Sequence, residues 1–295
     1  MSQTSYPCAK RGVFFMVLAM LIFSLLNAII KDTTSHYDTI QLVFFRCFFA
    51  AFPAAIFLMI KGGWKTPSAL EWKIHLKRAL LLPIGLTFLF IGIGALSLSN
   101  SMALYFSATL FLVILSYPIL RERVSFPQWL AVGVGFVGVL IIAKPSGNVF
   151  HWATLFIIMG VFMESAYNLY GRLLSSTYNS FMITFLGSLL PAFVSLIALP
   201  FVWIEPDLGG WLSLISLGLG GGLGQLCVTY AYYNAPAGIL APMIYSAMLW
   251  SVSLDIVLYG NWPTQSLFLG CGVIIASGLM IVFQESKKRK VHDKG

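Results

Sequence analysis

One stretch of the sequence combines an apolar run with a side chain that could do chemistry. Residues 159–172 read MGVFMESAYNLYGR, and Glu164, Asn168 and Gly171 are spaced i, i+4 and i+7. A helix places these three residues on one face. An acid at the middle of a membrane helix costs about 2.5–3.5 kcal/mol on insertion scales, so an ionisable group there is a candidate for function. We predict that Glu164 meets a substrate ammonium or a transported proton. The alternative is a protonated carboxyl that only bonds a neighbouring helix.

The same pattern occurs a second time near the N-terminus. Residues 23–31 align without a gap with residues 164–172, at an offset of 141, close to half of the 295 residues. Ser24 and Asn27 match a serine and Asn168 in the later copy, whereas Phe23 stands where the later copy has its glutamate. An Asn side chain offers both donors and an acceptor, so we predict that Ser24, Asn27 and Asn168 contact the substrate. Hydrogen bonding between helices is the alternative.

Other polar and aromatic residues in the apolar runs are further candidates. Counted along their helices, Arg46 lies about ten ångströms and Asp255 about six ångströms below the outer membrane surface, against about twenty for Glu164. We therefore expect Arg46 to pair with Asp255 rather than with Glu164, either as a structural pair or as a substrate contact, with Asp255 a second candidate for coupling. Aromatic faces bind cations, and the candidates for lining the same cavity are Tyr167, Tyr245 and Trp250.

Composition fixes the class of protein. Hydrophobic residues make up 59% and charged residues 9% of the chain, and the mean hydropathy is +0.88. Soluble domains have about 25% charged residues, so this is an integral membrane protein. The four cysteines lack the spacing of ligands or a redox motif, and we predict no metal and no cofactor. The glycine-rich residues 218–224 match no nucleotide-binding pattern, and we interpret them as a site of close helix packing or a flexible gate.

Ten apolar runs approach the roughly 20 residues that a membrane helix needs. They are residues 12–30, 39–60, 79–97, 100–119, 125–143, 150–170, 180–204, 211–230, 237–259 and 265–283. We predict an all-α membrane protein with ten transmembrane helices in two halves, residues 1–146 and residues 147–295, the second ending in a basic tail. Five helices per half is an odd number, so the second half must enter the membrane from the opposite side. Such 5+5 inverted-topology repeats typically build transporters with a central site.

The basic residues predict the orientation. With the N-terminus in the cytoplasm, fifteen of the 18 Lys and Arg residues fall on the cytoplasmic side and two outside. Both termini are therefore predicted to be cytoplasmic. The net charge of +8 then reflects topology and attraction to the lipid bilayer, not nucleic acid. Residues 67–78, including His75, are predicted to lie on the cytoplasmic interface. The absence of Asn-x-Ser/Thr sequons favours a bacterial inner membrane.

Several stretches resemble one known family. They are Phe44-Phe45-Arg46, residues 105–145 with PILRERVS at 118–125 and QWLAVGVGFVGVL at 128–140, Ala241-Pro242-Met243, and Gly270, Gly272 and Gly278. Together they resemble the EamA-type branch of the drug/metabolite transporter superfamily. The resemblance implies ten helices in a 5+5 inverted repeat, no ATP-binding module, and transport of small metabolites such as amino acids or nucleosides. The surroundings of Arg46 and Trp129 are similar to those of the S-adenosylmethionine carriers of that family.

The sequence also departs from the family pattern. Phe106 stands opposite Pro242 where both halves should have a proline, and Gly260-Asn261 stands where the second half should match Glu122. The two halves are thus asymmetric.

These observations predict a secondary transporter that moves a small amino-acid-like, nucleoside-like or cationic metabolite across the inner membrane by alternating access. The alternative is a membrane-embedded transferase acting on a lipid or acyl substrate, although the chain lacks a nucleophile–base set or an acidic metal cluster. A channel is a third possibility. Substrate identity, direction, coupling ion and oligomeric state stay open, and a monomer would suffice.

Overall fold

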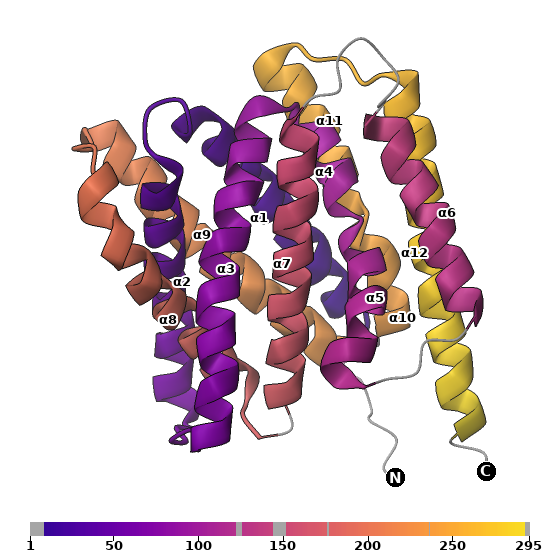
Figure 1. The fold of residues 1–295 in the computed structure, drawn as a ribbon, viewed down its shortest axis with the longest axis horizontal. Helices are drawn as coiled ribbons and strands as arrows, with labels where there is room; N and C mark the ends of the chain where they lie inside the picture. Colours follow the sequence, from indigo (N-terminus) through magenta and orange to yellow (C-terminus); the bar gives the residue numbers. More distant parts are fainter. Residues whose placement is uncertain (1–8, 122–125, 144–151, 176, 236, 293–295) are drawn as a thin grey trace.

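A computed structural model of the chain describes residues 9–121, 126–143, 152–175, 177–235 and 237–292, and every regular element in these residues is an α-helix (Figure 1). The joint at 145–148 and the turn at Glu122 lie outside the described residues. The helices are α1 (Ala9–Thr33), α2 (Thr39–Lys61), α3 (Ala69–Ala95), α4 (Leu98–Tyr105), α5 (Ala108–Leu120), α6 (Phe126–Ala143), α7 (Ala153–Leu174), α8 (Ser180–Val202), α9 (Leu208–Asn234), α10 (Ala237–Ile244), α11 (Ser246–Tyr259) and α12 (Gln265–His292).

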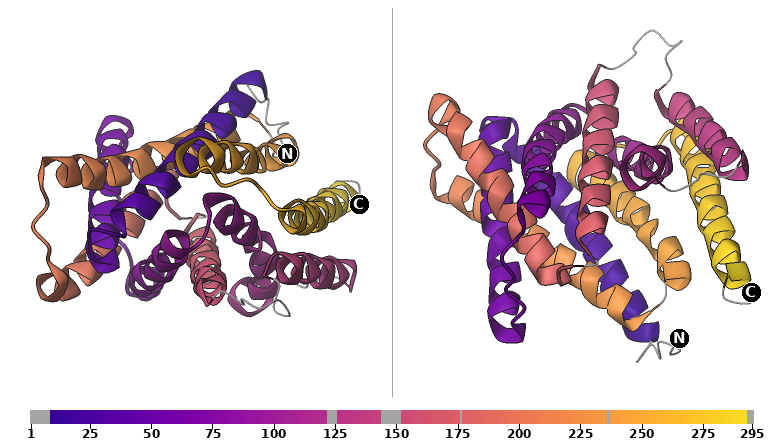
Figure 2. Two further views of the ribbon diagram at one scale, coloured as in Figure 1. Left: turned by 90° about the horizontal axis from the view of Figure 1, so that it is seen from above. Right: turned by 60° about the horizontal axis from the view of Figure 1, so that its bottom comes forward.

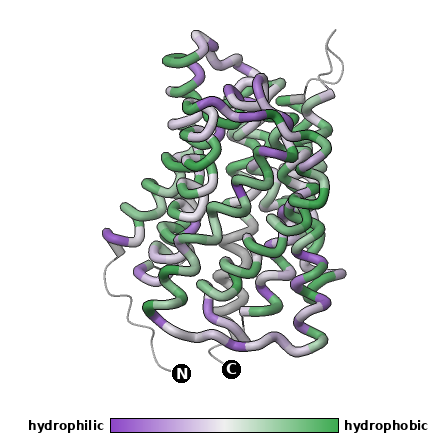
Figure 3. The backbone as a smooth tube through the Cα atoms, turned by 90° about the vertical axis from the view of Figure 1, so that its left-hand side faces the viewer, coloured by the Kyte–Doolittle hydropathy of each residue, from purple (hydrophilic) through white to green (hydrophobic). Residues whose placement is uncertain are grey.

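The helices have the length and composition of membrane spans. Seven helical segments of the described chain are long and apolar enough to cross a membrane, and α4 and α5 together count as one of them. Three shorter apolar helices, at 126–142, 246–259 and 265–280, accompany them. Hydrophilic residues gather mostly toward the two ends of the bundle, with hydrophobic residues between them (Figure 3). The chain is therefore a multi-pass membrane protein, as predicted.

Two of the predicted spans are broken, which corrects the sequence prediction of continuous helices. The run at 100–119 divides into α4 and α5 at Phe106 and Ser107, and the run at 237–259 divides into α10 and α11 at Tyr245. Neither break contains Gly or Pro. At the first break the Ser107 N–H bonds the Leu104 carbonyl, three residues back, so the chain tightens into a turn without leaving helical dihedral angles.

The helices recur along the chain at a nearly constant interval. The 23-residue helices α2 and α8 begin at Thr39 and Ser180, 141 residues apart. The 27-residue helices α3 and α9 begin 139 residues apart, and so do α4 and α10. Arg121 and Gly260, also 139 apart, end α5 and α11 in the left-handed region, at φ 58° and 66°. This interval places Phe106 opposite Tyr245, so the sequence alignment of Phe106 with Pro242 was wrong by three residues.

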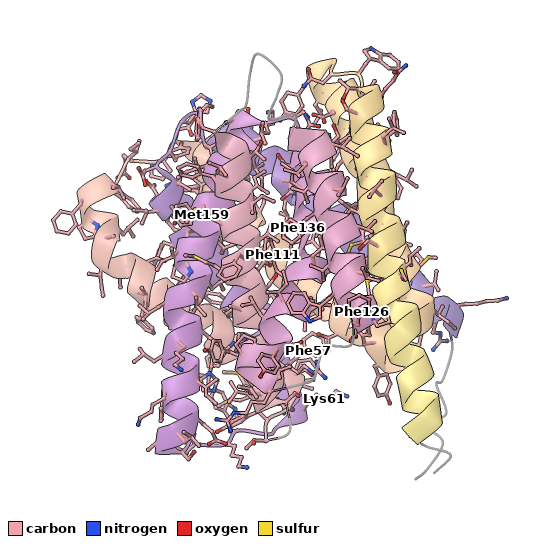
Figure 4. All side chains as sticks on the ribbon, turned by 45° about the vertical axis from the view of Figure 1, so that its right-hand side comes forward. Phe57, Lys61, Phe111, Phe126, Phe136 and Met159 are labelled. Carbon is pink, nitrogen blue, oxygen red and sulfur yellow. The ribbon has the colours of Figure 1, made fainter. Side chains whose placement is uncertain are left out.

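Close packing between helices surrounds the centre of the molecule. The helix α3 packs against α7, and α1 packs against α9 (Figures 1 and 2). The helices α6 and α12 cross so closely that a Cβ on Gly138 would stand 2.7 Å from the carbonyl oxygen of Gly270, and the converse distance is also 2.7 Å. Beside them, Phe111 of α5 and Phe136 of α6 pack edge to face (Figure 4). The glycines of α9 pack against α1 and α2, as residues 218–224 had suggested.

The predicted interfacial segment is instead the start of a long helix. Ser68 caps α3, and the Glu71 carboxylate accepts the Ser68 N–H in return, which completes a capping box. His75 was expected on the surface, but it is 1% exposed and packs against Trp72 and Tyr178. The physical reason is that α8 packs against this face of α3 and covers it. In an isolated amphipathic helix at the membrane surface, the same face would lie against lipid headgroups.

Candidate functional site

A cavity of about 850 Å³ lies at the centre of the bundle. Its walls come from α1, α3, α4, α5, α7 and α9, with single residues from α2, α6, α10 and α12. The two copies of the sequence motif, on α1 and α7, therefore line one cavity. Most of the lining is apolar, and its polar residues are Asn27, Arg46, Ser101, Tyr105, Thr109, Ser116, Gln128, Glu164, Asn168, Arg172, Gln225 and Tyr232.

Glu164 is the carboxylate of this cavity. Its Oε1 accepts a hydrogen bond of 2.9 Å from the hydroxyl of Tyr105. Its Oε2 is buried and has no hydrogen-bond partner in the part of the chain that the structure describes. A buried carboxylate oxygen without a donor is costly, so the unfilled acceptor is a place for a donor group of a ligand.

Three more of the predicted residues line the same cavity. Asn27 of α1 and Asn168 of α7 contribute amides from opposite halves of the chain, and Arg46 contributes a guanidinium from α2. The guanidinium occupies the space where a Cβ of Gly221 would stand. Arg46 and Glu164 thus line the same cavity. A carboxylate and a guanidinium in one cavity can hold both ends of a zwitterion.

Arg46 shares the cavity with Glu164 and not with Asp255, which corrects the depth estimate made from the sequence. Depth counted along single helices put Arg46 beside Asp255 and away from Glu164. The helices of the structure are tilted and cross one another (Figure 2), so equal counts along two helices do not mean equal depth in the bundle.

Asp255 has a different set of partners. Its carboxylate is fully buried and accepts hydrogen bonds from the N–H groups of Leu98, at 3.0 Å, and Ser99, at 2.6 Å, and from the Ser99 hydroxyl. These donors form the first turn of α4. An anion at a helix N-terminus binds free N–H groups and the positive end of the helix dipole. The geometry thus assigns Asp255 to holding α11 against α4.

Ser24 and Tyr167 point away from the cavity. Ser24 is buried and donates to the carbonyl of Ala247 on α11, 3.2 Å away. Tyr167 donates to the carbonyl of Gly187 on α8 and lies under the guanidinium of Arg78, with 4.2 Å from Cζ to the ring centroid. The predicted cation–π partner of Tyr167 is therefore a residue of the protein itself.

Tyr245 and Trp250 are not among the residues that line the cavity. The Tyr245 ring packs against Phe106, which does line the cavity, with 5.1 Å between ring centroids. Trp250 is half-buried against the main core, and its indole nitrogen has no hydrogen-bond partner among the described residues.

The sequence reasoning missed Tyr105, the direct partner of Glu164. A tyrosine in an apolar run is common near membrane surfaces, so its residue type alone gave no signal. Its position one residue before the break at Phe106 gave no signal either, because no Gly or Pro residue marks that break in the sequence.

Comparison with known proteins places this geometry in a family. A model of the EamA-like transporter family matches residues 10–144 and again residues 151–283. The chain belongs to the EamA-like transporter family. Each match covers one half of the chain. EamA proteins are transporters, so this chain is a membrane transporter and not an enzyme, and the transferase alternative is set aside.

Similar transporters come from several bacteria. An "Uncharacterized transporter" of Helicobacter pylori (strain ATCC 700392 / 26695) is 30% identical, with 92% of this chain and 94% of that protein aligned. An S-adenosylmethionine uptake transporter of Rickettsia conorii is 24% identical, with 94% of each chain aligned. A riboflavin transporter of Vibrio cholerae is 28% identical, with 95% of each aligned. These relatives support transport of a small metabolite.

A solved structure shares the fold. It is described as "Crystal structure of protein", aligns with 92% of this chain and 96% of its own at a TM-score of 0.65, and is 15% identical.

Proposed function

We propose that this EamA protein is a secondary transporter of a cationic or zwitterionic metabolite of the S-adenosylmethionine class. Transport would proceed by alternating access across a bacterial inner membrane, with both termini in the cytoplasm. Ten spans in a 5+5 inverted repeat, divided near residue 146, would supply the two moving halves. The recurrence of helix boundaries at 139–141 residues supports this arrangement.

The unpartnered Oε2 of Glu164 carries the proposal. A cationic substrate would place an ammonium or sulfonium beside this oxygen, while Arg46 receives the substrate carboxylate. Asn27 and Asn168 would then bond the remaining polar groups. A proton on Glu164 would compete with the cation, so binding and proton release would be linked, and Glu164 would be the coupling group.

Riboflavin is the competing substrate, because one relative of similar identity carries it. A flavin ring would fit the apolar lining. It brings no cation to Glu164, so the buried Oε2 would gain at most a hydrogen bond. The unpartnered carboxylate oxygen of Glu164 therefore favours the cationic class over riboflavin.

Flux into liposomes tests the proposal. The purified protein should carry labelled S-adenosylmethionine and should discriminate against riboflavin. Glu164→Gln keeps the shape of the side chain but cannot ionise, and we expect it to lower the affinity for S-adenosylmethionine at least about tenfold. Glu205→Gln makes the same change at an exposed position and serves as the matched control. If Glu164→Gln supports flux at the wild-type rate with the same pH profile, the carboxylate is structural and the proposal is wrong.

A further inference from the structure

The interval that relates the two halves also relates the Tyr105–Glu164 pair to two other residues of the same cavity. Glu164 stands 141 residues after Phe23, and Ile244 stands 139 residues after Tyr105. All four residues line the cavity. The hydrogen-bonded acid and phenol of one wall thus correspond to a phenylalanine and an isoleucine of the other.

Hydrogen bonds within the structure support this correspondence independently of the alignment. Ser24, next to Phe23, donates to the carbonyl of Ala247 at 3.2 Å. Ser165, next to Glu164, donates to the carbonyl of Ala108 at 3.5 Å. The two donors are 141 residues apart and the two acceptors 139 apart. One equivalent serine-to-carbonyl bond therefore lies beside each of the two pairs.

From this asymmetry we infer that Phe23 and Ile244 bind the apolar part of the substrate and thereby fix its orientation, with the cationic group held at Tyr105 and Glu164. This inference rests on the proposed function. A symmetric cavity with an acid on both sides would accept the cation at either end. Phe23 and Ile244 are apolar, so a substrate bound in the reversed orientation would bury its cation beside them without an anion. Glu164 would then also be left without a cation. Met20 and Met16, about one and two turns before Phe23 on α1, extend the apolar surface.

Two probes that share a head group separate the roles of the two pairs. S-adenosylmethionine and S-methylmethionine both have an ammonium, a carboxylate and a sulfonium, but only the first has the bulky nucleoside. Binding of each to the purified transporter is measured by calorimetry. We expect Glu164→Gln to weaken both probes by a similar factor, about tenfold or more. We expect Phe23→Ala to weaken S-adenosylmethionine about fivefold or more and S-methylmethionine less than twofold.

Matched variants keep the test decisive. Phe14→Ala removes a ring from an exposed position of α1, 62% exposed, and should change neither affinity. Ile244→Ala acts from α10 and should reproduce the selective effect of Phe23→Ala, which covers the case that one variant fails to fold.

Each failure has its own signature. If Glu164→Gln leaves both affinities unchanged, or if the wild-type protein binds neither probe, the proposed function fails. If Glu164→Gln weakens both probes but Phe23→Ala and Ile244→Ala weaken both equally, or neither, the cation site survives and the inferred orientation is overturned.

Discussion

The ring of Phe106 meets the ring of Tyr245 edge to face, with 5.1 Å between centroids and an interplanar angle of 81°. The two residues are 139 residues apart, the interval that relates α4 to α10, so equivalent positions of the two halves touch each other. Each of them also interrupts its own span. The broken helices of the two halves therefore meet at one aromatic contact beside the cavity.

We predict that this contact couples the two breaks energetically. Phe106→Ala and Tyr245→Ala should each lower the thermal stability of the protein in detergent, because each removes buried aromatic surface. Together they should cost less than the sum of the single changes, by about 0.5–1.5 kcal/mol, the value expected of an aromatic pair. Strictly additive effects in the double-mutant cycle would mean that the two rings do not stabilise each other.

Tyr105→Phe should weaken binding of S-adenosylmethionine by about three- to tenfold, because Glu164 loses the donor that orients it while the ring remains. Calorimetry on the purified protein measures the change. Tyr117→Phe removes a hydroxyl from a residue that is 62% exposed and is the control. An unchanged affinity for Tyr105→Phe would show that the bond does not position the carboxylate.

Asn27→Ala and Asn168→Ala should each lower substrate affinity while leaving the melting temperature nearly unchanged. Both amides line the cavity, so their loss should cost substrate contacts rather than helix packing. Asn234→Ala is the contrasting control, because that buried amide donates to the carbonyl of Tyr230 within α9 and should affect stability alone. If Asn27→Ala and Asn168→Ala lower the stability but leave the substrate affinity at the wild-type value, both residues have a structural role.

Asp255→Asn should destabilise the protein by about 1–3 kcal/mol, because one carboxylate oxygen that accepts N–H donors from α4 is replaced by a donor. Thermal unfolding measures the loss, with Asp32→Asn, on the exposed end of α1, as the control. Flux per folded molecule should keep its pH profile. A changed pH profile with normal stability would instead make Asp255 a coupling group.

Gly138→Ala should destabilise the crossing of α6 and α12 by about 1–3 kcal/mol, since the new Cβ would meet a backbone oxygen that cannot move aside. Gly133→Ala is a control on the same helix, because a Cβ there meets no atom within 4 Å. Equal melting temperatures for the two variants would contradict the close approach of the helices.

The sequence predicted the membrane class, the family, the shared cavity of α1 and α7, and many helix ends to within a few residues. The start of α3 was predicted ten residues too late and the end of α12 nine residues too early. Glu164 could be found because an acid in an apolar run is costly wherever the helix lies. The breaks at Phe106 and Tyr245 could not, because no Gly or Pro marks them and the tertiary contact between the rings is invisible in the sequence. The surroundings of Asp255 were also out of reach, because they depend on α11 packing beside the first turn of α4, a contact between residues 157 apart in the sequence.

The bonds of Ser24 and Ser165 to the carbonyls of Ala247 and Ala108 have a consequence for how such a carrier can change its cargo. Each half of the chain contributes the donor serine of one copy of this bond. The positions beside them differ completely, acid in one copy and aromatic ring in the other. If the proposed function holds, substitution of the neighbouring residue in either copy would change the cargo preference, while the serine bonds would keep the helices in the same relative position.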